Sequence, residues 1–86
     1  MTTDLTMLLE HCANSYRLGR EAEAATMLQQ VVNRFGSIIE QNPALLTPSV
    51  EASVAASLNY QQGSDWIALA DELQYVLKPQ IERMYQ

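Results

Sequence analysis

Residues 65–85 decide the fold, because their sequence, DWIALADELQYVLKPQIERMY, carries the strongest apolar periodicity in the chain. The apolar side chains recur at steps of three and four, which places them along one face of an α-helix. Pro79 lies inside the pattern and removes the hydrogen bond to the Tyr75 carbonyl, so we expect a kink there. The stretch predicts a long amphipathic helix that begins at a cap formed by Ser64 and Asp65. Its core face consists of Trp66, Leu69, Ala70, Leu73, Val76, Leu77 and Met84.

Residues 20–41 predict a second long helix with a broad apolar face. Such a face is typical of a helix that packs on more than one neighbour. Gly36 lies within this segment, where it either ends the helix early or allows a close helix crossing. The central stripe consists of Ala24, Leu28, Val31, Phe35 and Ile38, and it is widened by Ala25, Val32 and Ile39.

Two shorter helices are predicted at residues 4–18 and 48–62, ended by Gly19 and Gly63 respectively. Thr47 and Pro48 mark the start of the later one, because Thr is a good N-cap and Pro fits the first helical position. The apolar stripe of the first helix consists of Leu5, Leu8, Leu9, Cys12 and Tyr16. The apolar stripe of the helix at residues 48–62 consists of Val50, Val54 and Leu58.

The expected fold is all-α, a compact bundle of two antiparallel helical hairpins. No run alternates with period two and no Asn-Gly or Asp-Gly turn occurs, which argues against strands. The joints at Gly19 and Gly63 are so short that each helix pair must be antiparallel, and we expect both glycines to adopt conformations, or close packing, that disfavour a side chain. The chain is interpreted as one domain, 1–86, with hairpins at about 4–41 and 48–85 and a linker at 42–47.

The two predicted hairpins share a motif, YRLG at residues 16–19 and YQQG at residues 60–63, which lie 44 residues apart. In each half an alanine, Ala24 or Ala68, follows five residues after the Gly. This pattern resembles the turn of a tetratricopeptide repeat, and the resemblance implies close contact across each hairpin and a duplication. Any two Gly-jointed amphipathic hairpins would share the pattern, and two units fall short of the roughly three that a solenoid needs, so a compact bundle is favoured.

Residues 65–79 also resemble a segment of small helical proteins from bacterial motility and surface-glycan gene neighbourhoods. The shared pattern is an aromatic residue followed by Leu-Ala-Asp and then by Leu-x-Tyr-x-Leu-x-Pro, here Trp66 to Pro79. In size, acidity and helicity the chain is similar to flagellar and type III secretion export chaperones. These resemblances imply a bacterial protein that binds a protein client.

Composition narrows the function classes. Ten acidic residues against five basic ones give a net charge of −5, which argues against a nucleic-acid partner. A single Cys cannot form an internal disulfide or a cysteine zinc site. The longest uncharged run is interrupted by Asn59, Gln61 and Gln62, and the first residues lack the basic region of a signal peptide, so we expect a cytoplasmic protein with no membrane partner.

The sequence contains no motif that is typical of a catalytic, metal-binding or phosphate-binding site. Cys12 falls on an apolar stripe and is expected to be buried, whereas the neighbouring His11 falls on the opposite side and is expected to lie at the surface. No phosphate loop, nucleophile elbow, calcium loop or Glu-x-x-His pair occurs. We therefore expect no catalytic residue, no metal, no cofactor and no enzymatic activity.

The predicted function is a small cytoplasmic protein-interaction module: an adaptor, chaperone or assembly factor of a bacterial secretion or motility system. Its partner would be another protein, with an amphipathic helix of that partner docked between the hairpins. Two alternatives stay open: a structural homodimer subunit without another client, and a small ligand carrier or enzyme that uses the interior between hairpins. The candidate partner-binding patch, an apolar centre with an acidic rim, consists of Ala68, Glu72, Tyr75, Pro79 and Glu82.

Overall fold

The computed structural model describes residues 2–84, which form four helices and no strand, so the predicted all-α class is confirmed. The last helix runs without a break through α4, a π-helical stretch η2, and α5, and a short 3-10 turn, η1, lies between α2 and α3. Its predicted end, Tyr85, lies outside the described residues. The bounds are α1 Thr2–Arg17, α2 Glu21–Gln41, η1 Pro43–Leu45, α3 Pro48–Gln62, α4 Trp66–Asp71, η2 Glu72–Leu77 and α5 Lys78–Met84.

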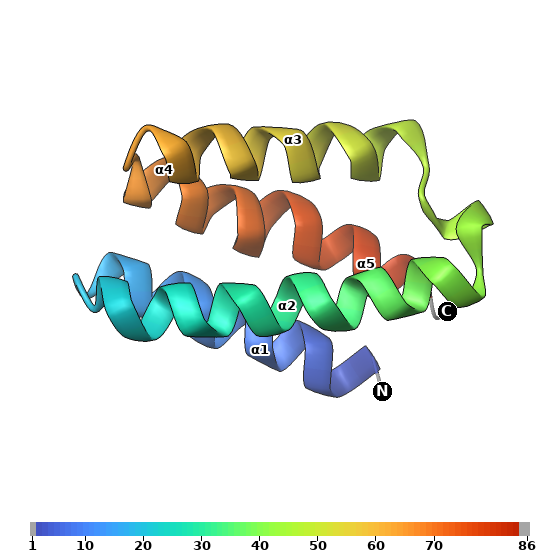
Figure 1. Ribbon diagram of the computed structural model, residues 1–86, viewed down its shortest axis with the longest axis horizontal. Coiled ribbons are helices and arrows are strands. Elements are labelled where there is room, and N and C mark those ends of the chain that lie inside the picture. The colour runs from blue at the N-terminus through green and yellow to red at the C-terminus, as the bar shows by residue number, and fades with distance from the viewer. Residues whose placement is uncertain (1, 85–86) are drawn as a thin grey trace.

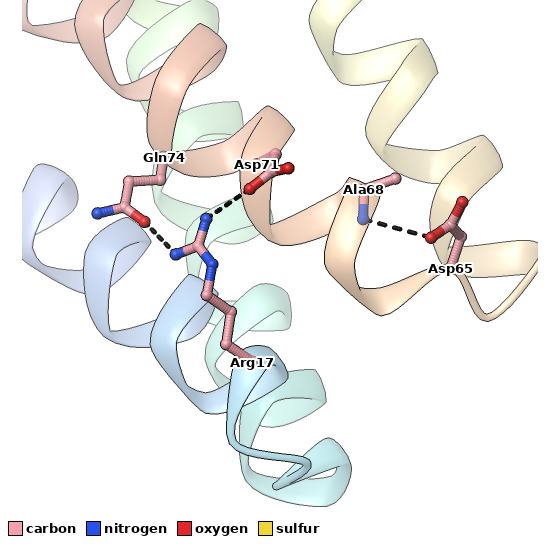
Figure 2. A network of polar contacts seen from close by, with 5 residues as sticks. All are labelled: Arg17, Asp65, Ala68, Asp71 and Gln74. Atoms are coloured by element: carbon pink, nitrogen blue, oxygen red, sulfur yellow. Dashed lines mark hydrogen bonds and ion pairs between the residues drawn. The ribbon is translucent and has the colours of Figure 1, made fainter.

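Two helices begin at the caps that the sequence predicts. The Thr47 hydroxyl accepts a hydrogen bond from the Val50 N–H at 3.3 Å, and Pro48 occupies the first turn of α3. The Asp65 carboxylate accepts one from the Ala68 N–H at 3.3 Å at the start of α4 (Figure 2). Each side chain satisfies a backbone donor that has no partner within the helix, which fixes where the helix starts.

Gly19 ends α1 in the left-handed conformation, with φ 77°. Around it the Arg20 N–H donates to the Ser15 carbonyl at 2.9 Å and the Gly19 N–H donates to the Tyr16 carbonyl at 3.1 Å. This pair of bonds is the Schellman arrangement, in which a residue without Cβ strain is favoured at the left-handed position. The prediction for Gly19 is therefore confirmed.

The corresponding prediction for Gly63 is wrong. Gly63 has φ −84°, and the left-handed position of the second turn is taken by Ser64, with φ 56°. The same two bonds recur, from the Asp65 N–H to the Tyr60 carbonyl and from the Ser64 N–H to the Gln61 carbonyl. The equivalent turn positions thus lie 45 residues apart, whereas the sequence match spans 44. When the two turns are aligned, the two Tyr-x-x-Gly motifs are therefore offset by one residue.

The last helix lies between α1 and α3 and contacts both of them (Figure 1). On its other side α1 packs along α2, whereas α2 and α3 scarcely touch each other. The radius of gyration is 12.0 Å, which equals the value of about 12 Å expected for a compact chain of this length. The described residues form one compact globule with α1 and the last helix at its centre.

The core is formed mainly by α1, α2 and the last helix, because α3 contributes a single buried apolar side chain, Val50. Its small residues Ser53 and Ser57 are buried against the last helix instead. The other buried apolar residues are Leu5, Leu9, Cys12, Ala13, Tyr16, Ala24, Leu28, Val31, Phe35, Leu69, Ala70, Leu73, Leu77 and Ile81.

The π-helical stretch η2 changes which residues of the last helix face the core. The Lys78 N–H donates to the Leu73 carbonyl, five residues back, so the helix is widened in the turn before Pro79. This widening accommodates a residue that has no N–H and clashes with the carbonyl four residues back. As a result Val76, predicted in the core, is 42% exposed, and Ile81, absent from the predicted face, is fully buried.

Neither prediction for Gly36 is correct. α2 continues through it to Gln41, and a Cβ at this position would have no atom within 4 Å. Ala25 and Val32, predicted to widen the packed face of α2, are exposed. The physical reason is that α2 packs closely on α1 alone, so the second half of its apolar face has no helix against it.

Candidate functional site

The α2/α3 groove is a hollow of about 480 Å³ that lies between these two helices. Since α2 packs on α1 and α3 packs on the last helix, their facing sides stay apart, and the turn η1 bridges them at one end (Figure 1). Leu73 and Leu77 of η2 reach the bottom of the groove. The floor is therefore the stretch of the last helix that is widened ahead of Pro79.

The walls are almost entirely apolar. Glu40 and Ser57 are the polar residues among those that line the groove. The α2 wall includes Leu28, Val32, Phe35, Gly36 and Ile39. The α3 wall and the closed end include Val54, Leu58, Pro43 and Leu46.

Several of these side chains are exposed although they are large and apolar. Val32 is 50% exposed, Leu58 47% and Leu46 37%. They lie on α2, on α3 and in the linker, so apolar surface faces solvent on both walls and at one end. Large exposed apolar patches on soluble proteins mark sites that bind other proteins, membranes or ligands.

Apart from the carboxylate of Glu40, the lining offers no polar group that is free to recognise a ligand. The Ser57 hydroxyl donates to the Ser53 carbonyl of its own helix at 2.9 Å, and Glu40 is exposed. The Ser53 hydroxyl, beside the groove, donates to the Glu72 carboxylate at 2.7 Å. A ligand in this groove would be held by apolar contact and shape.

The residues of the predicted partner-binding patch lie on the last helix but contact different neighbours. Glu72 is half-buried and accepts the hydrogen bond from Ser53 on α3. Tyr75 is 66% exposed and lies on the side of α1, where Arg17 covers its ring. Ala68 and Pro79 are half-buried, and Glu82 is exposed. Two members of the patch, Glu72 and Tyr75, thus already have contacts with other helices.

Arg17 at the end of α1 binds the last helix through three contacts. Its guanidinium donates to the Asp71 carboxylate at 2.7 Å and to the Gln74 side-chain oxygen, as Figure 2 shows. The same group lies over the Tyr75 ring, 5.4 Å from its centroid. Asp71 and Gln74 flank the junction of α4 and η2, so the contacts tie α1 to the start of the π-helical stretch.

Cys12 and His11 lie where the sequence predicts. Cys12 is fully buried and its thiol donates to the Ala24 carbonyl at 3.4 Å, while His11 is exposed. Burial raises the pKa of the Cys12 thiol to about 12. A thiol with such a pKa is almost entirely protonated at neutral pH, and the protonated form is a poor nucleophile.

The side chains of the described residues form no group of three or more His, Cys, Asp or Glu that could hold a metal ion. Within residues 2–84 no helix combines the length and apolar character needed to span a membrane. Comparisons of this chain with protein-family models, with curated proteins and with solved structures found no match.

Sequence reasoning missed the groove residues because their signal is the same as that of core residues. Val32 and Leu58 fit the helical stripes, and this spacing predicts an interior position for both. One signal pointed the other way: the apolar face of residues 24–39 is broader than one neighbouring helix can cover. The apolar residues of α3 do not gather on one face, and this helix contributes a single buried apolar side chain, so it leaves part of the broad face of α2 exposed.

Proposed function

We propose that this chain is a protein-interaction module that captures an apolar helical segment of another protein in the α2/α3 groove. The observation that carries the proposal is an almost wholly apolar groove that exposes Val32, Leu46 and Leu58 between two helices. Covering these side chains would remove apolar surface from water, which is the main driving force of association.

A helix is the occupant that suits the groove best. The wall on α2 extends from Leu28 to Glu40, about 18 Å at the rise of an α-helix, which is the length of roughly three helical turns. A helix satisfies its own backbone hydrogen bonds, so it can enter a groove whose lining is almost entirely apolar. An amphipathic helix would place one apolar stripe on the floor formed by Leu73 and Leu77.

In this proposal the chain is two antiparallel hairpins, formed by α1 with α2 and by α3 with the last helix. The two Schellman turns at Gly19 and Ser64 support this arrangement. The outer helices of the two hairpins, α2 and α3, then form the two walls of the binding site. The proposal includes a tetratricopeptide-like duplication in which equivalent positions of the two halves lie 45 residues apart, one more than in the sequence match.

The groove is a better candidate than the Tyr75 patch for the primary binding site. Tyr75 already contacts the Arg17 guanidinium, and Glu72 already accepts a hydrogen bond from Ser53. A partner on that patch would have to compete with these contacts. The groove has no such internal partner, so a ligand there gains apolar burial without breaking a polar contact.

A ligand carrier is the second candidate, because a volume of about 480 Å³ lies within the range of small-molecule sites, about 300–1,000 Å³. Such sites usually hold a few polar groups that orient the ligand, and here Ser57 is engaged within its own helix. This favours a peptide helix over a polar metabolite. A homodimer without another client would also cover the groove, and the experiment below distinguishes it.

The biological setting that we propose follows from the resemblances in the sequence. The module would act in the cytoplasm as an adaptor, chaperone or assembly factor of a bacterial secretion or motility system. Binding and shielding an apolar helix of a client until it is exported or assembled would suit an open groove. It would need no enzymatic activity, metal or cofactor.

The test is affinity capture with three forms of the chain: wild type, Gly36→Leu and Tyr75→Ala. Gly36 lines the groove and a Cβ there would meet no atom within 4 Å, so a leucine at this position would extend into the groove from a helix that tolerates it. Gly36→Ala is the matched control, since it restores helix propensity with much less filling of the groove. Analytical ultracentrifugation of each purified form gives its oligomeric state.

The proposal expects clients that bind wild type, Gly36→Ala and Tyr75→Ala but are lost with Gly36→Leu. Capture that survives Gly36→Leu and is lost with Tyr75→Ala would move the interaction to the Tyr75 patch. A dimer that Gly36→Leu converts to monomer, with no client, would show that a second copy occupies the groove. Each of the last two results would overturn the proposal.

A further inference from the structure

We infer that the helix that binds the α2/α3 groove is basic beside its apolar stripe, with Lys or Arg at the end that lies against Glu40. This inference rests on the proposed function, because it specifies the partner of the same groove. It commits to a different protein as the occupant, since a second copy of this chain would bring its own net charge of −5 to the groove.

The first observation is the charge of the lining itself. Glu40 is the charged residue among those that line the groove, and its carboxylate is exposed and has no bonding partner among the described residues. Two other acids form ion pairs within the fold. Glu10 pairs with Lys78 at 3.5 Å, and Asp71 pairs with Arg17 at 2.7 Å. Glu40 is therefore free to bind a cation brought by a partner.

The second observation is where the cations of the chain lie. All five Lys and Arg residues are among the described residues, and none of them lines the groove. Arg34 lines a separate hollow between α1 and α2, and Arg83 lines another beside the start of α3. The set consists of Arg17, Arg20, Arg34, Lys78 and Arg83. An incoming cation at Glu40 would thus meet no positive charge in the groove.

The third observation concerns the end of the groove at which Glu40 lies. Glu40 is in the last turn of α2, where the helix dipole is negative, and that turn carries no basic residue. The linker joins this end of α2 to the start of α3 (Figure 1), where Glu51 in the first turn offsets the positive end of the α3 dipole. This end of the groove therefore favours a cation, while the rest of the lining selects for apolar side chains.

The experiment measures binding of three synthetic helical peptides to the purified chain by fluorescence anisotropy. Each peptide has the same leucine stripe and is long enough for roughly three turns, about 12 residues at 1.5 Å per residue. They differ in the residues beside the stripe at one end, which are arginine, glutamine or glutamate. The chain is used as wild type, as Glu40→Gln and as Glu82→Gln, which removes an equal charge on α5 away from the groove lining. Gly36→Leu reports whether binding takes place in the groove.

The inference expects the arginine peptide to bind about fivefold more tightly than the glutamate peptide, the size of one or two exposed ion-pair effects. Glu40→Gln should reduce this ratio to below about twofold, Glu82→Gln should preserve it, and raising the ionic strength should shrink it. Equal binding of all three peptides, abolished by Gly36→Leu, would overturn the charge preference and leave the groove as the binding site. Peptides that bind Gly36→Leu as well as wild type, or that do not bind at all, would contradict the proposed function too.

Discussion

The rings of Tyr16 and Trp66 stack on each other, with centroids 5.1 Å apart and an angle of 11° between their planes. Tyr16 lies near the end of α1 and Trp66 is the first residue of α4, so the stack joins the two central helices next to both turns. It lies at the end of the molecule where Arg17 also binds the last helix. Together these contacts fix the last helix, and with it the groove floor, against α1.

Trp66→Ala should destabilise the fold by about 3 kcal/mol, because it removes the stack and a large apolar surface that packs on the core. Urea unfolding followed by circular dichroism measures the change. Ile67→Ala is the matched control: Ile67 is 58% exposed, so its loss should change stability by less than about 0.5 kcal/mol. Equal effects of the two substitutions would show that the stack does not anchor the last helix.

Tyr16→Phe should leave stability unchanged or raise it by up to about 1 kcal/mol. The Tyr16 hydroxyl is buried, with no hydrogen-bond partner among the described residues. Replacing it removes a desolvated polar group while the stacking ring stays. The same unfolding experiment measures this, and a loss of more than about 1 kcal/mol would indicate that the hydroxyl has a bonding partner, such as an internal water.

Stability should decline as the pH rises from about 9 towards about 12. Burial raises the pKa of Cys12 from 9.0 to about 12. Burial, and then the charges of Cys12 and Glu21, raise the pKa of Tyr16 from 10.0 to about 12. The unfolded chain therefore releases these protons at lower pH than the folded chain, so their contribution is complete below pH 9 and is lost as the pH passes through the folded-state values.

Unfolding free energies at a series of pH values between 7 and 11 test this. Tyr16→Phe should flatten the decline above pH 10, the ordinary pKa of the residue it replaces. The matched control Tyr75→Phe removes a hydroxyl from an exposed ring and should leave the pH profile as it is in wild type. A profile in which both variants behave alike would contradict the assignment to Tyr16.

The helices were predictable because local signals agree with the final packing. Thr47 and Asp65 cap the helices that they were predicted to cap, and Gly19 takes the left-handed position. Val76 and Ile81 were misplaced because the stripe assumed one uniform helical period through Pro79. The π-helical stretch alters that period. Where it forms depends on how the backbone avoids the clash with the Pro79 ring, and the spacing of apolar residues carries no information about this.

The groove was harder to predict than the helices, because exposure depends on the distance between two helices. The sequence places Val32 and Leu58 on apolar faces, and only the packing of α2 on α1 and of α3 on the last helix leaves them opposite each other and uncovered. Two residues of the Tyr75 patch already have contacts within the fold that the sequence does not reveal. Glu72 and Tyr75 lie within η2, where the helical period changes.

Arg17→Ala should destabilise the fold by about 1 kcal/mol, because it removes the ion pair with Asp71, the hydrogen bond to Gln74 and the contact with the Tyr75 ring. Arg17→Lys should lose part of this, since an ammonium cannot reproduce the planar, forked contact. Arg20→Ala is the control, because the Arg20 side chain is exposed and makes no hydrogen bond or ion pair within residues 2–84. Thermal melts at low and high salt measure the series, and an Arg17 effect that matches Arg20→Ala would contradict the prediction.

Replacing the turn glycine by alanine should lower stability at the first turn but not at the second. Gly19→Ala should destabilise the fold by about 1 kcal/mol or more, because φ is 77° and a side chain is strained there even though the space is open. Gly63→Ala should be neutral or slightly stabilising, because φ is −84° and its Cβ would lie 3.5 Å from the nearest atom, an ordinary contact.

Ser64→Gly should stabilise the fold by about 0.5–1 kcal/mol. It removes the strain of a side chain at φ 56°, and this gain exceeds the conformational entropy that a glycine adds to the unfolded chain. The three variants carry single small changes at neighbouring positions of two equivalent turns, so each controls for the others. Melting temperatures should therefore rank Ser64→Gly above wild type and Gly19→Ala below it. If Gly63→Ala were the damaging substitution instead, the left-handed position of the second turn would be at Gly63, and the 44-residue register of the sequence match would be restored.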